Sequence, residues 1–306
     1  MHILILGAAG MIGRKLTAAI AAGGLPTNRL TLADVTAPTP PDAIPTTALA
    51  VNLANPGIAT RLVADRPDLI FHLAAVVSGE AEVDFDKGYA VNLDASRALL
   101  EAIRTLPGYH PRLVFASSLA AFGAPFPDLI PDDFHPTPLT SYGTQKAITE
   151  LLISDYSRRG ILDGISLRLP TICIRPGAPN RAASGFFSSI LREPLAGLPA
   201  TLPVPDTTRH WFASARIDTA QIGPRRAVNM PGLSATVAEE IEALRRVAGQ
   251  KAVDLITRIP DPTIAAIVGN WAGNFAPARA TALGFRADAS FDDIIRAYLQ
   301  DDAPGT

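Results

Sequence analysis

The chain of 306 residues has one cysteine, Cys173, and five histidines. A single thiol can form neither a disulfide framework nor a thiolate metal site, and the histidines show no ligand spacing. Ile172 and Ile174 flank Cys173, which is typical of a packed thiol. The sequence therefore predicts no metal centre and no disulfide.

The chain also lacks a charge excess and a long apolar run. Its 27 Lys and Arg residues and 29 Asp and Glu residues give a net charge of −2, so no basic surface for nucleic acid or a membrane is expected. No apolar run reaches about 18 residues, the length that would suggest a membrane span. The first predicted strand begins at residue 2, which leaves no room for a signal peptide. We therefore expect a cytoplasmic protein without nucleic-acid or membrane partners.

A glycine-rich turn near the N-terminus carries the first functional signal. The apolar run 3–6 leads directly into Gly7, Gly10 and Gly13, and then into a predicted helix at 14–20. Such a turn lets the backbone approach a pyrophosphate, which then lies at the positive end of the helix. Asp34 ends the next predicted strand, at the spacing of an acid that binds the adenosine ribose. Its carboxylate would repel a 2′-phosphate, so NAD is predicted rather than NADP; a solvated strand end is the alternative for Asp34.

Strand-like and helix-like segments alternate through the first half of the chain, which predicts an α/β fold with a doubly wound parallel sheet of the Rossmann type. After residue 169 this regularity fades. We predict an NAD-binding domain over residues 1–170 and a smaller substrate-binding lobe over 171–306, partly interleaved with it. The predicted strands are 30–33, 49–51, 69–75 and 112–116, and the predicted helices are 56–64, 82–105, 183–191, 236–248, 262–271, 290–299 and one that carries Tyr142 and Lys146.

Tyr142 and Lys146 have the i, i+4 spacing that places two side chains on one face of a helix. A phenol is a weak base at neutral pH, but a nearby ammonium favours its phenolate and lowers the phenol pKa. This face can therefore perform proton chemistry. The same spacing also occurs on ordinary amphipathic helices, where the tyrosine is half-buried and the lysine is solvated.

The motifs occur in the order of one family: Gly7, Gly10 and Gly13, residues 72–75, Ser118, Tyr142 and Lys146. The chain resembles the extended short-chain dehydrogenase/reductase family, which includes NAD-dependent nucleotide-sugar epimerases and dehydratases. Within it, segments 76–82, 122–127, 139–147, 168–177, 183–187 and 230–234 resemble the NAD-dependent D-erythronate dehydrogenases. This resemblance implies oxidation of D-erythronate at C2 to 2-dehydro-D-erythronate. It also implies a homodimer formed through the long helix after Glu82 and the helix of Tyr142.

The resemblance implies roles for individual residues. Tyr142 would be the general base, Ser118 would hydrogen-bond the reacting oxygen, and Lys146 would steady the phenolate and hold the nicotinamide ribose. Ser117 is the alternative to Ser118, and Asn92 could pack the helices instead of facing the cofactor. The expected NAD-binding residues are Gly7, Gly10, Met11, Ile12, Gly13, Asp34, Asn52, Leu53, Leu73, Ala74, Ala75, Asn92, Tyr142, Lys146 and Pro170.

A small anionic substrate needs a fixed cation, ideally an arginine, and partners for its hydroxyl groups. Arg175 is the preferred cation, with Arg181, Arg209 and Arg216 as alternatives, although each could instead form a structural ion pair. The remaining expected substrate residues are Ser78, Ser118 and Thr171. Relatives in the family it resembles continue after Arg216 with a helix of about three turns, whereas Ile217 and Asp218 follow at once in this sequence. Either this chain lost that helix or a segment is missing from the sequence, and the second explanation is preferred.

Two other functions share these motifs. An epimerase or dehydratase would keep its NAD tightly bound and show no net reduction, whereas a dehydrogenase must release NADH. A non-catalytic dinucleotide-binding protein would have no need of the Ser118, Tyr142 and Lys146 set.

Overall fold

The computed structural model describes residues 1–177, 182–214 and 226–303. These residues form two compact units. Unit 1 contains the described residues 1–118, 140–168 and 226–228, and unit 2 contains 119–139, the described part of 169–214, and 229–303. The chain thus passes between the units several times, and the domain boundary expected at residue 170 stays a prediction.

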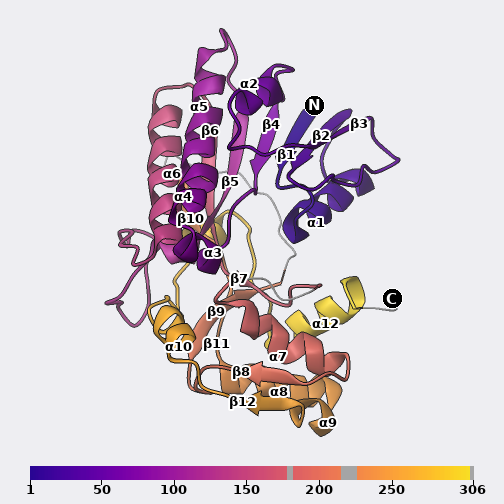
Figure 1. The fold of residues 1–306 in the computed structure, drawn as a ribbon, viewed down its shortest axis with the longest axis vertical. Coiled ribbons are helices and arrows are strands. Elements are labelled where there is room, and N and C mark those ends of the chain that lie inside the picture. Colours follow the sequence, from indigo (N-terminus) through magenta and orange to yellow (C-terminus); the bar gives the residue numbers. More distant parts are fainter. Residues whose placement is uncertain (178–181, 215–225, 304–306) are drawn as a thin grey trace. The chain divides into compact units, whose positions relative to one another are not determined.

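Unit 1 is built on a seven-stranded sheet in the order β10-β6-β5-β4-β1-β2-β3, counted over the described residues (Figure 1). The neighbours β1–β2, β2–β3, β1–β4 and β4–β5 are parallel. The strands are β1 (His2–Leu6), β2 (Arg29–Asp34), β3 (Thr46–Ala50), β4 (Leu69–His72), β5 (Arg112–Ser118), β6 (Asp163–Leu169) and β10 (Ala227–Asn229).

Both faces of this sheet are covered, because successive side chains of a strand point to opposite faces. In β1, Ile3 and Ile5 join one apolar cluster with Ile20, whereas Leu4 and Leu6 join another with residues of α2, α5 and α6. β4 is buried along its whole length, as expected for a central strand. The helical segments are α1 (Met11–Ala19), η1 (Ile20–Gly24), α2 (Ile58–Val63), α3 (Ser78–Val83), α4 (Phe85–Tyr89), η2 (Ala90–Asp94), α5 (Ala95–Thr105) and α6 (Ser141–Arg158).

The single long helix expected at 82–105 is wrong: this segment is divided into α3, α4, η2 and α5. Asp84 has a non-helical backbone and accepts a hydrogen bond from the Lys87 N–H at 3.0 Å, so it ends α3 and caps α4. η2 is a turn of π-helix, a feature that is frequent at functional sites.

Unit 2 has two small sheets and a separate apolar core. One sheet has the order β11-β9-β7, and the other pairs β12 with β8 in parallel. Cys173 is 1% exposed in this core, which confirms the expected packed thiol. The elements are η3 (Leu119–Ala121), β7 (Thr171–Ile172), α7 (Gly185–Leu195), β8 (Ala200–Leu202), β9 (Arg209–Ala213), β11 (Leu233–Thr236), α8 (Val237–Ala248), α9 (Gln250–Val253), β12 (Ile256–Arg258), α10 (Pro262–Gly269), α11 (Ala278–Ala282) and α12 (Phe291–Asp301).

The predicted α/β class with a Rossmann-type sheet is confirmed. Among the described residues, no helix is both long and apolar enough to cross a membrane.

Candidate functional site

The glycine turn between β1 and α1 is a close-packed backbone cradle in unit 1. Gly7 has φ +84°, and a Cβ at this position would lie 2.6 Å from the Ala74 nitrogen. A Cβ on Gly13 would overlap the carbonyl oxygen of Gly7. Both positions therefore require glycine, because any side chain would push the turn away from the loop after β4 or from the start of α1.

The first turn of α1 presents unused backbone donors. Gly10 is the N-cap and its residue type offers no capping side chain. Within the described residues, the N–H groups of Met11, Ile12 and Gly13 have no protein acceptor. Helix N-terminal amides of this kind bind anionic oxygens, so the turn fits the pyrophosphate of a dinucleotide.

Asp34 ends β2 beside this turn. Its Oδ2 accepts a hydrogen bond from the Ala9 N–H at 3.0 Å, and its Oδ1 accepts one from the Thr36 N–H at 3.3 Å. The carboxylate is therefore held at the rim of the glycine turn, at the carboxyl end of a parallel strand, where ribose hydroxyls are bound in Rossmann sheets.

The other expected cofactor residues of unit 1 also follow strands. Asn52 and Leu53 come after β3, and the Asn52 Oδ1 accepts a hydrogen bond from the Ala54 N–H at 3.0 Å. Leu73, Ala74 and Ala75 come after β4, which ends three residues earlier than the predicted 69–75. The Leu73 N–H still donates to the Leu6 carbonyl at 2.8 Å, so this loop stays attached to the end of β1.

Asn92 is 2% exposed and lies in η2. Its Oδ1 accepts a hydrogen bond from the Val76 N–H at 2.8 Å, and its Nδ2 donates to the Val76 carbonyl at 3.1 Å and to the Gln145 Oε1 at 2.7 Å. The side chain therefore connects the loop after β4 to α6. These contacts match the helix-packing alternative, and a role of Asn92 in cofactor binding stays a prediction.

Tyr142 and Lys146 lie in the first half of α6, whose N-cap is Thr140. The Thr140 hydroxyl accepts a hydrogen bond from the Gly143 N–H at 3.1 Å, which fixes the start of the helix just before Tyr142. The Lys146 Nζ is 5.6 Å from the centre of the Tyr142 ring. Tyr142 is half-buried, so its ring is both supported and accessible.

Lys146 is almost completely enclosed, with 2% exposure. Its Nζ donates to the Ala116 carbonyl at 2.8 Å and lies 4.5 Å from the centre of the Phe115 ring. Burial lowers the pKa of this amine to about 7, although the Glu150 carboxylate favours the charged form. Burial together with the charge of Lys146 also lowers the pKa of His72 to about 3, so this neighbour stays neutral.

The two adjacent serines at the end of β5 face opposite sides of the strand. Ser117 is 3% exposed and donates to the Glu150 Oε1 at 2.5 Å, and Glu150 also accepts hydrogen bonds from Arg168, with the Arg168 Nη2 at 2.7 Å. Ser118 is half-buried on the other side. The Ser117 hydroxyl is thus part of the buried Glu150–Arg168 ion-pair network. The choice of Ser118 over Ser117 as the substrate serine stays a prediction.

The expected substrate residues are divided between the units. Ser78 begins α3 in unit 1. In unit 2, the Thr171 Oγ1 is 2.5 Å from the His210 Nε2, and Pro170 directly precedes β7. Arg175 donates to the Ile172 carbonyl at 3.1 Å and to the Ser184 Oγ at 2.9 Å. Its guanidinium therefore already stabilises the segment between β7 and α7.

Of the alternative arginines, Arg209 donates to Ser234 and lies 3.6 Å from the Glu239 carboxylate. Arg181, Arg216 and the position after Arg216 where relatives continue with a helix lie outside the described residues.

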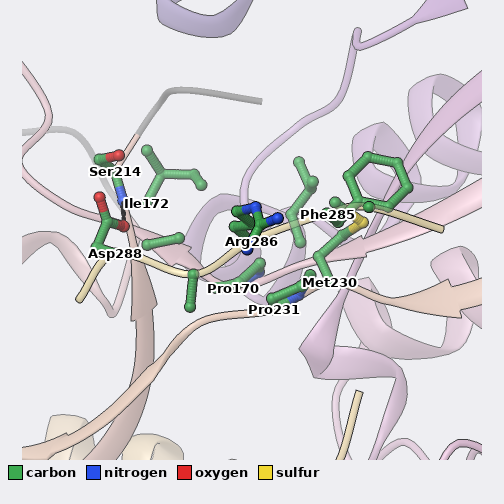
Figure 2. Close-up of a pocket in the computed structure, with 12 residues that line it drawn as sticks. Pro170, Ile172, Ser214, Met230, Pro231, Phe285, Arg286 and Asp288 are labelled. Atoms are coloured by element: carbon green, nitrogen blue, oxygen red, sulfur yellow. Dashed lines mark hydrogen bonds between the residues drawn. The ribbon is translucent and has the colours of Figure 1, made fainter. Parts of the chain in front are cut away.

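The sequence analysis missed a pocket in unit 2, lined in part by Ser214, Arg286 and Asp288 (Figure 2). No motif marks Arg286, which is exposed and directly follows the buried Phe285. Within the described residues, no cluster of three or more His, Cys, Asp or Glu side chains could hold a metal ion.

Comparisons with known proteins agree with this geometry. Residues 3–211 match the model of the NAD dependent epimerase/dehydratase family. The chain is 47% identical over 320 aligned residues to a D-erythronate dehydrogenase from Cupriavidus necator, covering 98% of both chains. It is 39% identical to a D-erythronate dehydrogenase from Haemophilus influenzae, covering 99% of this chain and 100% of the relative.

Among solved structures, the fold is similar to one described as a nucleoside-diphosphate-sugar epimerase from Agrobacterium tumefaciens. The two share 57% identity with a TM-score of 0.93, over 100% of this chain and 95% of the other. The predicted resemblance and the prediction of an NAD-dependent enzyme are both confirmed. The chain belongs to the NAD-dependent epimerase/dehydratase family.

Proposed function

We propose that this protein is an NAD-dependent dehydrogenase that oxidises the C2 hydroxyl of D-erythronate to give 2-dehydro-D-erythronate. The observation that carries the proposal is the 47% identity to a D-erythronate dehydrogenase across 98% of both chains. The glycine cradle, the free amides of α1 and Asp34 fit a dinucleotide without a 2′-phosphate.

In the proposed reaction, Tyr142 takes the proton from the substrate hydroxyl as its oxygen becomes a carbonyl. The Ser118 hydroxyl donates to that oxygen and orients the C2 carbon. Lys146 in its protonated form places a positive charge beside the phenol, which favours the phenolate. NAD, when bound, accepts the hydride that leaves C2. The proton and the hydride thus leave the same CH–OH group to different acceptors.

The test is absorbance at the NADH band during turnover of aldonic acids of three to six carbons with NAD or NADP. We expect net NADH formation with D-erythronate and NAD. Tyr142→Phe is expected to reduce kcat by about 10²- to 10⁴-fold while NADH still binds, because only the proton acceptor is lost. Strong turnover of a hexonate with none of erythronate would reject this substrate but not the reaction class.

A nucleotide-sugar epimerase remains a second candidate because of the 57% identical structure described in those terms. Such an enzyme interconverts sugar nucleotides without net NADH formation. Product analysis of a nucleoside-diphosphate sugar, with no absorbance change and with NAD retained through gel filtration, would favour it.

We also propose a homodimer formed through the helices of unit 1, as the family resemblance implies. Val83, Phe85 and Leu151, on α3, α4 and α6, are 82%, 56% and 70% exposed. Large apolar side chains that remain this exposed commonly mark an interface. Leu151→Glu is therefore expected to convert a dimer to a monomer in light scattering, whereas a dimer unaffected by this change would place the interface elsewhere.

A further inference from the structure

A pocket in unit 2 has the composition of a site for a small polar acid. Its volume is about 260 Å³, slightly below the range of about 300–1,000 Å³ typical of sites for drug-sized ligands. A molecule of only a few carbons therefore suits it better than a nucleotide sugar. Every lining residue belongs to unit 2, so its shape is set within one compact body.

Three segments that follow strands build the wall. Leu169 and Pro170 come at the end of β6, Ala213 and Ser214 at the end of β9, and Met230 directly after β10. Residues 284–288, from the connection between α11 and α12, complete it. The sequence analysis expected Pro170 to be near the cofactor. Leu169 is the last residue of β6, and in Rossmann-type sheets ligands bind at the carboxyl ends of the strands.

Arg286 supplies the positive charge of the pocket. Within the described part of the chain, its guanidinium has no hydrogen bond or ion pair with the protein. Figure 2 shows its side chain between the Ser214 and Asp288 pair and the apolar side formed by Met230 and Phe285. The planar fork of an arginine matches the two oxygens of a carboxylate.

Asp288 supplies an acceptor in the same pocket. Its Oδ2 accepts a hydrogen bond from the Ser214 N–H at 2.7 Å, which fixes the carboxylate against the wall. An ionised carboxylate can accept several hydrogen bonds, so Asp288 has capacity left for hydroxyl donors. A cation and an anchored acceptor, separated by one residue in the sequence, thus offer one partner for a carboxylate and one for an alcohol.

We propose that this pocket binds the hydroxy-acid substrate, with Arg286 pairing with its carboxylate and Asp288 accepting from its hydroxyl groups. The inference rests on the proposed function for the identity of the acid. Arg175 and Arg209, the cations expected from the sequence, already contact protein groups. Among the described residues, Arg286 is therefore preferred over Arg175 and Arg209 as the cation that binds the substrate carboxylate.

The experiment compares wild type with Arg286→Gln, Arg286→Lys and Asp288→Asn. D-Erythronate is titrated calorimetrically into each enzyme saturated with NADH, and KM values are measured for D-erythronate and NAD separately. The side-chain amide oxygen in the Asp288→Asn variant could still accept the bond from Ser214, so this change removes charge while keeping the local structure. Arg258→Gln is the matched control, because Arg258 is an exposed arginine of unit 2 that pairs with Asp206 outside the pocket.

Arg286→Gln is expected to raise the Kd and the KM for D-erythronate by about 10- to 100-fold, the range for a lost hydrogen bond to a charged group. The KM for NAD should change less than about twofold. Arg286→Lys should lose less affinity than the glutamine variant, because it keeps the charge without the fork. Arg258→Gln should leave every constant unchanged.

The outcomes separate this inference from the proposed function. If wild type oxidises D-erythronate and Arg286→Gln retains the wild-type Kd and KM, the pocket assignment is overturned and the function stands. If wild type binds D-erythronate through Arg286 but does not oxidise it, the pocket assignment stands and the proposed reaction fails. If wild type neither binds nor oxidises any aldonate, both are overturned.

Discussion

Replacing Lys146 with methionine should change how the stability of the apoprotein depends on pH. The amine has a pKa of about 7 in the folded protein, where burial opposes its charge, against 10.5 for a free lysine. Between these two values the unfolded chain binds a proton that the folded chain does not, so stability rises with pH. Below pH 7 both states are protonated and the cost of the buried charge stays constant.

Each pH unit in this window is worth about 1.4 kcal/mol. From pH 7 to pH 9, allowing for the partly protonated folded state at pH 7, wild type should gain about 2 kcal/mol in the free energy of unfolding relative to Lys146→Met. The two proteins are compared by how their free energy of unfolding changes with pH, and not by its value at one pH. The reason is that Lys146→Met also loses the hydrogen bond to the Ala116 carbonyl.

The measurement is urea unfolding of both proteins without cofactor at half-unit steps from pH 6 to pH 9. Lys251→Met is the matched control, since Lys251 is an exposed lysine of α9 and its variant should run parallel to wild type. A stability difference between wild type and Lys146→Met that stays constant across this range would refute the reasoning, because the amine would then titrate alike in both states.

Three further predictions concern other parts of the fold. Asp34→Ser should raise the ratio of kcat/KM for NADP over NAD by at least about 10-fold, because a carboxylate repels a 2′-phosphate; an unchanged ratio would remove Asp34 from the ribose site. Gly13→Ala should cost about 1–3 kcal/mol in thermal unfolding and weaken NAD binding, because the new methyl group overlaps a backbone carbonyl. Gly269→Ala, where a Cβ meets nothing within 4 Å, serves as its control, and equal losses in the two variants would contradict the close-packing argument. Glu240 is fully buried, neither of its carboxylate oxygens has a hydrogen-bond partner among the described residues, and burial raises its pKa well above the usual range. Wild type should therefore lose stability as pH rises above the pKa of a free carboxyl group, and Glu240→Gln should lose less between pH 5 and pH 8. Glu242→Gln is the control, because the Glu242 side chain is 46% exposed. Melting temperatures that fall in parallel with rising pH in wild type and both variants would contradict this.

The sequence predicted those elements that are determined by residues close together in the chain. The run from β1 through the glycine turn into α1, and the pairing of Tyr142 with Lys146 on α6, both follow from spacing and residue type alone. The helix expected at 82–105 failed because Asp84 caps a new helix through its own side chain, which overrides the helical preference of its neighbours.

The substrate cation could not be predicted in the same way. Arg175 follows a strand and looks available in the sequence, but its partners Ile172 and Ser184 are visible only in the folded chain. Arg286 lies in a connection without a motif, more than a hundred residues beyond the end of α6. Only tertiary packing brings it into the same pocket as Ser214 and Met230.

The buried amide of Asn92 has a consequence for anyone who wishes to redesign coenzyme preference. Because the Asn92 side chain joins Val76 to Gln145 by hydrogen bonds, a loop insertion or deletion just after β4 would also displace the turn of α6 that carries Tyr142, the proposed proton acceptor. Asp34 is not part of these hydrogen bonds, since its carboxylate accepts from the backbone amides of Ala9 and Thr36. Selectivity at the adenosine end should therefore be tunable by point changes at β2, whereas libraries that vary the 74–76 loop should mostly yield poorly active proteins.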